Sequence, residues 1–175
     1  MYTLHCTKKL LDRVKQPIAP AEPEPATKLG NWYATAVFWK PQIVLAVNER
    51  TLLPVILPLA PATTVADRLP DALAYVLRGI GIDEATIADE LAAMNDVTVA
   101  KTANQNRSVL GIINEFTFMA EHAIARGHER DDLDLALWLA NTPCSPLRNS
   151  TGFPNDEARL ALTGQPPIRP APRNL

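Results

Sequence analysis

The order of predicted elements along the chain indicates an α+β fold. Segments typical of β-strands come early, helical patterns fill the later part, and one strand pattern returns between two helices. This order predicts a mostly antiparallel sheet of about four to five strands, with a helical layer packed on one face. The chain has neither a GxGxxG nor a GxxxxGKS/T motif, so the sequence does not support a dinucleotide-binding or P-loop fold.

The first third of the sequence supplies most of the predicted strands. "YTLHC" at residues 2–6 predicts a short strand, and a short helix follows with Thr7 as its N-cap. Residues 16–28, "QPIAPAEPEPATK", predict an extended connector, because proline fixes φ and has no N–H group. Pro54 cannot donate to a β-ladder, so it places its strand at an edge or a bulge. Aromatic and β-branched residues predict three consecutive antiparallel strands: Trp32 to Lys40, Gln42 to Asn48 and Leu52 to Leu57.

Helical periodicity dominates the rest of the chain. Apolar residues from Leu69 to Ile80 predict a helix with Pro70 at its first position, and Asp83 is the expected N-cap of the next. "DVTVAKT" returns to strand alternation, and the longest helix is predicted from about Arg107 to Arg126, before Gly127. "DDLDLALWLAN" and "PNDEARLAL" predict two more helices. The proline-rich residues 164–175 predict a disordered tail, which leaves 1–163 as a single domain.

Composition narrows the classes of function. A formal net charge of −2 over 175 residues argues against a strongly basic nucleic-acid-binding scaffold, although a local patch stays compatible with it. Cys6 and Cys144 lie far apart and outside any metal-binding spacing, which favours two reduced thiols in a cytoplasmic protein and no metal or other cofactor. No apolar run approaches the roughly 18 residues of a membrane span, so no membrane partner is expected.

"KTANQNRSVLGIINE", residues 101–115, is the strongest candidate for a site. Its polar start passes directly into an amphipathic helix, whose N-terminus presents unpaired N–H groups and a partial positive charge. Lys101, Asn106, Arg107 and Ser108 at such a junction suit a phosphate, a carboxylate or an acidic side chain of a partner. The simpler interpretation is a well-capped helix, with Asn106 or Ser108 as the cap and the cations solvated or paired with acidic side chains.

A second candidate is the turn "VNERT", Asn48 to Thr51, where Asn, Glu and Arg could orient a ligand or serve as ordinary turn residues. Aromatic side chains beside a few polar groups are typical of ligand pockets, so we expect these segments to converge in space. Lys8 and Lys9 would add positive charge. The residues predicted to bind the ligand are Trp32, Tyr33, Asn48, Arg50, Lys101, Asn106, Arg107, Ser108 and Asn114.

Several of these segments carry a family resemblance. The chain is similar to an uncharacterised family of small bacterial proteins at "TKKLL", "LGNWYA", "VNERTLLPV", "KTANQNRSVLG" with "NEF", and "TPCSPL". The resemblance covers most of residues 1–163. It implies a bacterial, cytoplasmic protein and brings no assigned activity, substrate or cofactor.

Three hypotheses of function follow. The first is a binding or regulatory module for a small anionic ligand, a nucleotide or an acidic protein segment. The second is a small metal-independent ribonuclease of toxin type, in which Lys101 and Arg107 would act with Glu49 or Glu115. The third is a structural or assembly component that uses the proline-rich segments. The sequence ranks them in this order, leaves open whether the protein is an enzyme, and disfavours nucleic acid as partner because phosphate affinity rests on cations.

Overall fold

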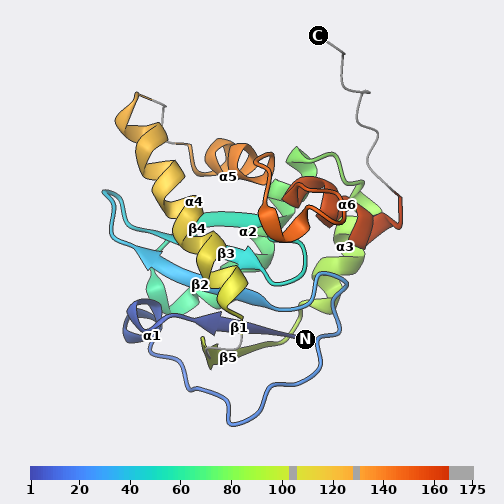
Figure 1. Ribbon diagram of the computed structural model, residues 1–175. Helices are drawn as coiled ribbons and strands as arrows, with labels where there is room; N and C mark the ends of the chain where they lie inside the picture. The colour runs from blue at the N-terminus through green and yellow to red at the C-terminus, as the bar shows by residue number, and fades with distance from the viewer. Residues whose placement is uncertain (103–105, 128–130, 166–175) are drawn as a thin grey trace.

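The computed structural model describes residues 1–102, 106–127 and 131–165, and its centre is a five-stranded sheet in the order β4-β3-β2-β1-β5 (Figure 1). Strand β1 pairs in parallel with both β2 and β5, whereas β2, β3 and β4 form antiparallel pairs. The α+β class is confirmed, but the sheet is mixed and not mostly antiparallel. The strands are β1 (Tyr2–Cys6), β2 (Trp32–Val37), β3 (Ile43–Asn48), β4 (Pro54–Pro58) and β5 (Val97–Lys101).

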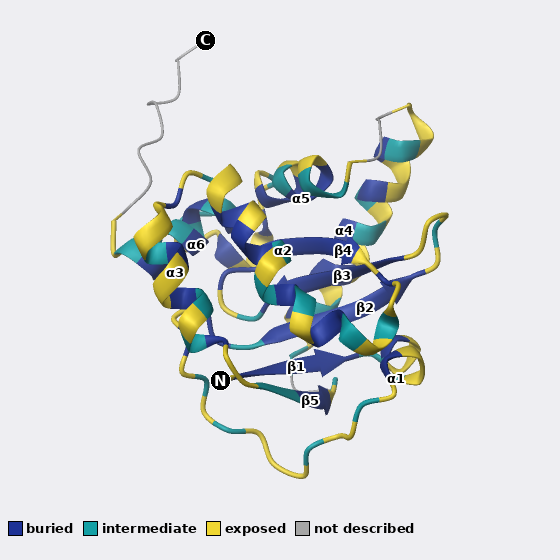
Figure 2. Ribbon diagram, turned by 180° about the vertical axis from the view of Figure 1, so that it is seen from behind, coloured by how far each residue is buried: buried dark blue, intermediate teal, exposed yellow. Residues whose placement is uncertain are grey.

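Helices cover both faces of the sheet, not the single face predicted. Figures 1 and 2 show α4 on one face and α2 on the other. The helices that follow β1 and β5 explain the difference. The helix after β1 lies on the face of α2, whereas α4, which follows β5, lies on the opposite face. The α-helices are α1 (Lys8–Val14), α2 (Val65–Gly79), α3 (Glu84–Ala93), α4 (Arg107–Ala125), α5 (Asp132–Ala140) and α6 (Pro154–Thr163), with 3₁₀ turns at Ala62–Thr64 and Ser145–Leu147.

The parallel pairing depends on the proline-rich connector. From the end of α1, the connector passes the outer edge of the sheet, where the Ala19 N–H donates to the Val99 carbonyl of β5 at 3.0 Å. It then returns to the amino end of β1, where the Ala26 N–H donates to the Met1 carbonyl at 2.9 Å. The chain therefore enters β2 in the same direction as β1. A short hairpin could not do this, because parallel strands need a crossover.

Most predicted elements occur with shifted ends. Strand β2 ends at Val37, and β4 begins at Pro54 on the edge of the sheet, where a residue without an N–H is tolerated. Asp83 is the N-cap of α3, and its side chain accepts from the Thr86 N–H at 2.9 Å. Helix α2 begins at Val65, so the prediction of Pro70 at the first position was wrong: this proline lies inside the helix.

Pro70 frees a carbonyl that β1 then uses. Because proline has no N–H, the carbonyl of Ala66, four residues earlier, lacks its usual helical donor. The phenol of Tyr2, which is fully buried, donates to this oxygen at 3.0 Å. Burial is the main cause that raises the pKa of Tyr2 above its ordinary value, so the phenol stays a neutral donor. One hydrogen bond thereby joins the sheet to α2.

We expect Tyr2→Phe to lower the free energy of unfolding by about 1–2 kcal/mol, since it leaves a buried carbonyl without a donor. In a Pro70→Ala background the new N–H of residue 70 can reach Ala66, so the same change should matter less. Denaturant unfolding of the four proteins in this double-mutant cycle measures the difference. Equal effects of Tyr2→Phe in both backgrounds would show that the phenol does not compensate for the proline.

Most of the predicted proline-rich tail cannot be compared with the structure. From residue 166 onward, it lies outside the described residues. Within the described ranges, no helix has both the length and the apolar character needed to cross a bilayer.

Candidate functional site

The carboxyl ends of β1 and β5 form a crevice at one end of the sheet. The two strands are neighbours and parallel, with Cys6 opposite Lys101. After β1 the chain enters α1, which packs beside the 3₁₀ turn that precedes α2, whereas after β5 it continues to α4 on the opposite face (Figures 1 and 2). In sheets of this kind, ligands bind outside the carboxyl ends of adjacent strands whose connections leave toward opposite faces. The topology therefore marks this crevice as the place for a site.

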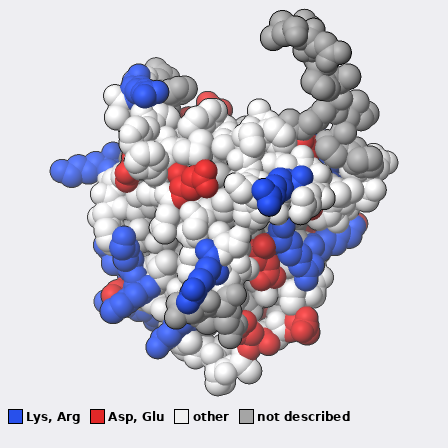
Figure 3. Space-filling view, viewed as in Figure 1, with Lys and Arg blue, Asp and Glu red and all other residues white. Residues whose placement is uncertain are grey.

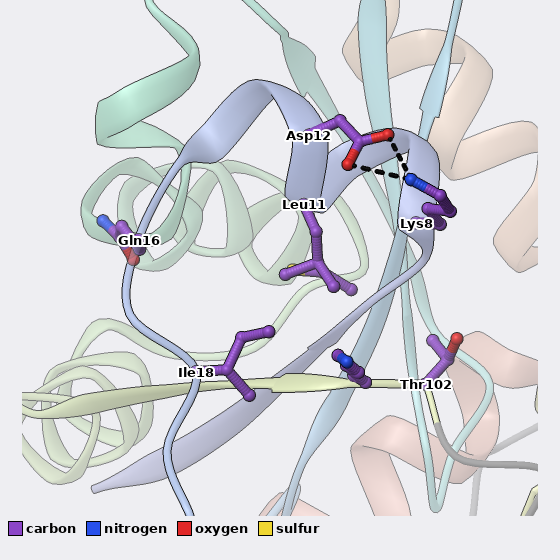
Figure 4. Close-up of a pocket in the computed structure, with 8 residues that line it drawn as sticks. Lys8, Leu11, Asp12, Gln16, Ile18 and Thr102 are labelled. Carbon is purple, nitrogen blue, oxygen red and sulfur yellow. Dashed lines mark hydrogen bonds and ion pairs between the residues drawn. The ribbon is translucent and has the colours of Figure 1, made fainter.

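A cavity of about 450 Å³ opens there (Figure 4). This volume falls in the range that accommodates small-molecule ligands. Three separate segments build its wall: the start of α1 with the end of β1, the first part of the connector, and the end of β5. The lining residues are Cys6, Lys8, Leu11, Asp12, Gln16, Ile18, Lys101 and Thr102.

The two lysines of the cavity differ in their partners. The ammonium of Lys8 lies 3.2 and 3.0 Å from the two carboxylate oxygens of Asp12, one helical turn further along α1. Lys101 is exposed, and its side chain has neither a hydrogen bond nor an ion pair within residues 1–102, 106–127 and 131–165. Figure 3 shows Lys and Arg side chains gathered at the lower left of one face, the region of α1 and the start of α4 in Figure 1. The cavity thus keeps one uncompensated positive charge.

The connector forms a fixed wall on the side facing α1. The Gln16 side-chain amide donates to the Thr63 carbonyl at 3.0 Å, and the Ala19 backbone is held by Val99. Between these two anchors Ile18 is 44% exposed, and Figure 4 shows it on the same side of the cavity as Gln16, with Leu11 pointing in from α1. The proline-rich segment therefore contributes apolar surface to the cavity.

The cysteine in the cavity wall is buried, and its surroundings favour the neutral thiol over the thiolate. Cys6 is only 1% exposed, and burial raises the pKa of its thiol to about 12. Cys144 is also a buried free thiol, with a pKa raised to about 11 first by burial and then by the charge of Glu115. Both cysteines are therefore neutral and apolar in character.

The predicted strand-to-helix junction is divided by the structure. Asn106 caps α4, with its side-chain oxygen accepting from the Val109 N–H at 3.3 Å. Arg107 and Ser108 are exposed on the first turn of α4, outside the wall of the 450 Å³ cavity. Asn114 is exposed and lines a second cavity, of about 280 Å³, together with Lys9. Of the site residues predicted in this segment, Lys101 is the one that lines the larger cavity, where its neighbour Thr102 lies beside it.

The turn after β3 lies at the opposite end of the sheet. Because β3 is antiparallel to β2, Asn48 pairs with Trp32 at the amino end of β2, away from the carboxyl ends of β1 and β5. Asn48 is fully buried and uses its side chain within the turn and the preceding loop. The Arg50 guanidinium donates to the Lys28 carbonyl at 3.1 Å. These residues have structural roles, and the expected convergence with Lys101 does not occur.

The two aromatic residues of the predicted site lie inside the protein. Trp32 is fully buried, and its indole N–H has no hydrogen-bond partner among the described residues. Tyr33 stacks on His5 of β1, with ring centroids 4.4 Å apart. Neither lines the cavity. Apart from Lys101, the residues that line it were absent from the predicted set, and the sequence signal for them is the i,i+4 spacing of Lys8 and Asp12.

The fold and the cavity define a mixed α+β protein with a ligand-sized crevice between parallel strands. Over residues 3–157 the chain matches the family described as a domain of unknown function (DUF6933), and it belongs to this family. This match confirms the resemblance to an uncharacterised family. No curated protein and no solved structure matches the chain. Within the described ranges, no group of His, Cys, Asp and Glu is placed to hold a metal ion.

Proposed function

We propose that the protein is a binding module that takes a small anionic ligand in the crevice between β1 and β5. The observation that carries this proposal is the ammonium of Lys101, unpaired among the described residues, in a cavity of about 450 Å³. A charged hydrogen bond to an anion at this position would be stronger than one between neutral groups. The neutral hydroxyl of Thr102 would help to orient the ligand, as a few aimed polar groups do in most pockets.

The alternatives from the sequence receive less support. The ribonuclease hypothesis names Glu49 or Glu115 as the carboxylate that acts with Lys101, but Glu49 lies at the far end of the sheet, where its side chain accepts from the Asn31 N–H at 2.8 Å. Glu115 is then the remaining candidate base, and it lies on α4. The assembly hypothesis relies on the proline-rich segments. One of them, the connector, already has a local role, because its residues Gln16 and Ile18 form part of the cavity wall. The bacterial origin and the cytoplasmic location of the protein remain predictions from the sequence.

Titration with inorganic phosphate, acetate and hexanoate, followed by backbone amide NMR, tests the proposal. We expect the amide signals of Cys6, Leu11 and Thr102 to shift with at least one of these anions. Lys101→Ala should weaken that binding about 10-fold or more, because a hydrogen bond to a charged group contributes roughly 1.5–3 kcal/mol.

Lys40→Ala is the matched control, since Lys40 is also exposed but lies in the β2–β3 connection, outside this cavity. It should leave the affinity unchanged. If no anion shifts these signals, or if both lysine variants weaken binding equally, the crevice is not an anion site.

A further inference from the structure

We infer that the ligand of this crevice is an amphipathic monoanion, an organic carboxylate with an apolar body, and not a multiply charged phosphate. The inference rests on the proposed function and specifies the chemical class of ligand. It follows from the charge balance of the cavity and from the position of its apolar residues.

The charge balance limits the head group to one negative charge. Among the described residues of the wall, Lys8 and Lys101 carry positive charges and Asp12 carries a negative one. Because both carboxylate oxygens of Asp12 lie within 3.2 Å of the Lys8 ammonium, that pair is already matched. Within the part of the wall that the structure describes, Lys101 is then the free cation, and it suits a single carboxylate. A triphosphate would bring several charges to a wall that offers one cation and also holds a carboxylate.

The apolar part of the wall calls for an apolar ligand body. Leu11 is half-buried, and Ile18 keeps 44% of its surface exposed although it is aliphatic. Figure 4 shows both side chains bordering the space between α1, the connector and the end of β5. Cys6 lies almost fully buried beneath this part of the wall, and burial raises the pKa of its thiol. Inorganic phosphate bound at Lys101 would leave this apolar surface without contacts. A ligand with an alkyl or aryl chain would cover it.

The polar and the apolar parts of the wall lie on different sides of the cavity, so one ligand can contact both. Lys101 and Thr102 end β5, whereas Leu11 comes from α1 and Ile18 from the connector. A carboxylate held at the β5 side would direct its chain toward the α1 and connector side. The side-chain hydroxyl of Thr102 has no partner within the described part of the chain and can donate to the same carboxylate.

Isothermal titration of the full chain with acetate, butanoate, hexanoate, inorganic phosphate and ATP tests the inference. Affinity should rise with chain length by up to about fourfold per methylene, the value expected for full burial of a CH₂ group. Hexanoate should therefore bind more tightly than acetate, inorganic phosphate or ATP. Lys101→Ala should weaken binding of all three carboxylates by a similar factor.

Ile18→Ser separates a specific pocket from general hydrophobic adsorption. This exposed residue can be changed with little effect on the fold, which a melting curve checks, and the change should flatten the dependence on chain length. Phe118→Ser is the matched control, because Phe118 is 60% exposed on α4, away from the cavity wall. It should preserve the dependence.

The outcomes distinguish the two proposals. Binding of phosphate or ATP that depends on Lys101, without any gain from longer carboxylates, would overturn the inference and leave the anion site standing. A chain-length dependence that survives Ile18→Ser would also overturn the inference. If no probe binds, both the proposed anion site and the inferred class of ligand are wrong.

Discussion

Asn48→Ala is expected to lower the free energy of unfolding by about 3–4 kcal/mol, which for a domain of this size corresponds to a fall in melting temperature of about 10 °C. The side-chain amide of Asn48 donates to the carbonyls of Leu29 and Asn31, at 2.9 and 3.1 Å. Its oxygen accepts from the N–H groups of Arg50 and Thr51 and from the Thr51 hydroxyl, at 3.1, 3.0 and 2.9 Å. Alanine removes all of these bonds and leaves buried groups without partners.

Asn114→Ala is the matched control for this prediction. It makes the same change in an exposed helical position, where alanine has the higher helix propensity. Its unfolding free energy should therefore stay within about 0.5 kcal/mol of the wild type. Thermal and denaturant unfolding of both variants measures the contrast. A loss below 1 kcal/mol for Asn48→Ala would show that the turn holds without this side chain.

Glu90→Ala should lower the free energy of unfolding by about 2–4 kcal/mol, because it removes both acceptors of two backbone N–H groups. Glu90 lies on α3 and is only 3% exposed. Its carboxylate accepts from the N–H groups of Lys28 and Leu29, both at 2.9 Å, and so fixes the end of the connector just before β2. Without it, the connector loses an anchor to α3 and two of its N–H groups lose their partners.

Two variants sharpen this test. Glu90→Gln keeps one acceptor oxygen and should lie between the wild type and the alanine variant in chemical denaturation. Asp89→Ala changes the neighbouring, exposed carboxylate of the same helix and should have little effect. If Glu90→Gln destabilises as much as Glu90→Ala, the negative charge itself, and not the number of acceptors, holds the connector.

Local sequence patterns predicted the elements well, because they depend on neighbours along the chain. The buried positions of α4 follow the helical period from Val109 to Ala123, and the N-caps Asp83 and Asn106 follow from their side-chain chemistry. Pairing of strands depends instead on segments far apart. Nothing in "YTLHC" shows that β1 lies between β2 and β5, so the parallel half of the sheet was missed.

The site was predicted less well for the same reason. Polar residues in the turn after β3 predict ligand contacts, but Asn48 and Glu49 organise the loop around Gly30, where φ is +80° and a Cβ would meet the Arg50 side chain at 2.7 Å. Polar side chains serve turns and ligands with the same groups, so composition cannot separate the two uses. Lys101, one of the predicted site residues, lines the 450 Å³ cavity, whereas Ile18 lies in a segment whose composition predicts only an extended connector.

The pairing of β1 with β5 joins two segments that lie far apart in the sequence, and this separation affects folding during translation. Residues 2–6 leave the ribosome before β5, one of their two neighbours in the sheet, which is complete only when residue 101 has been added. At about 5–20 residues per second, β1 waits for several seconds with an open hydrogen-bonding edge. Nascent chains of this protein should therefore stay sensitive to proteases until β5 has emerged from the exit tunnel.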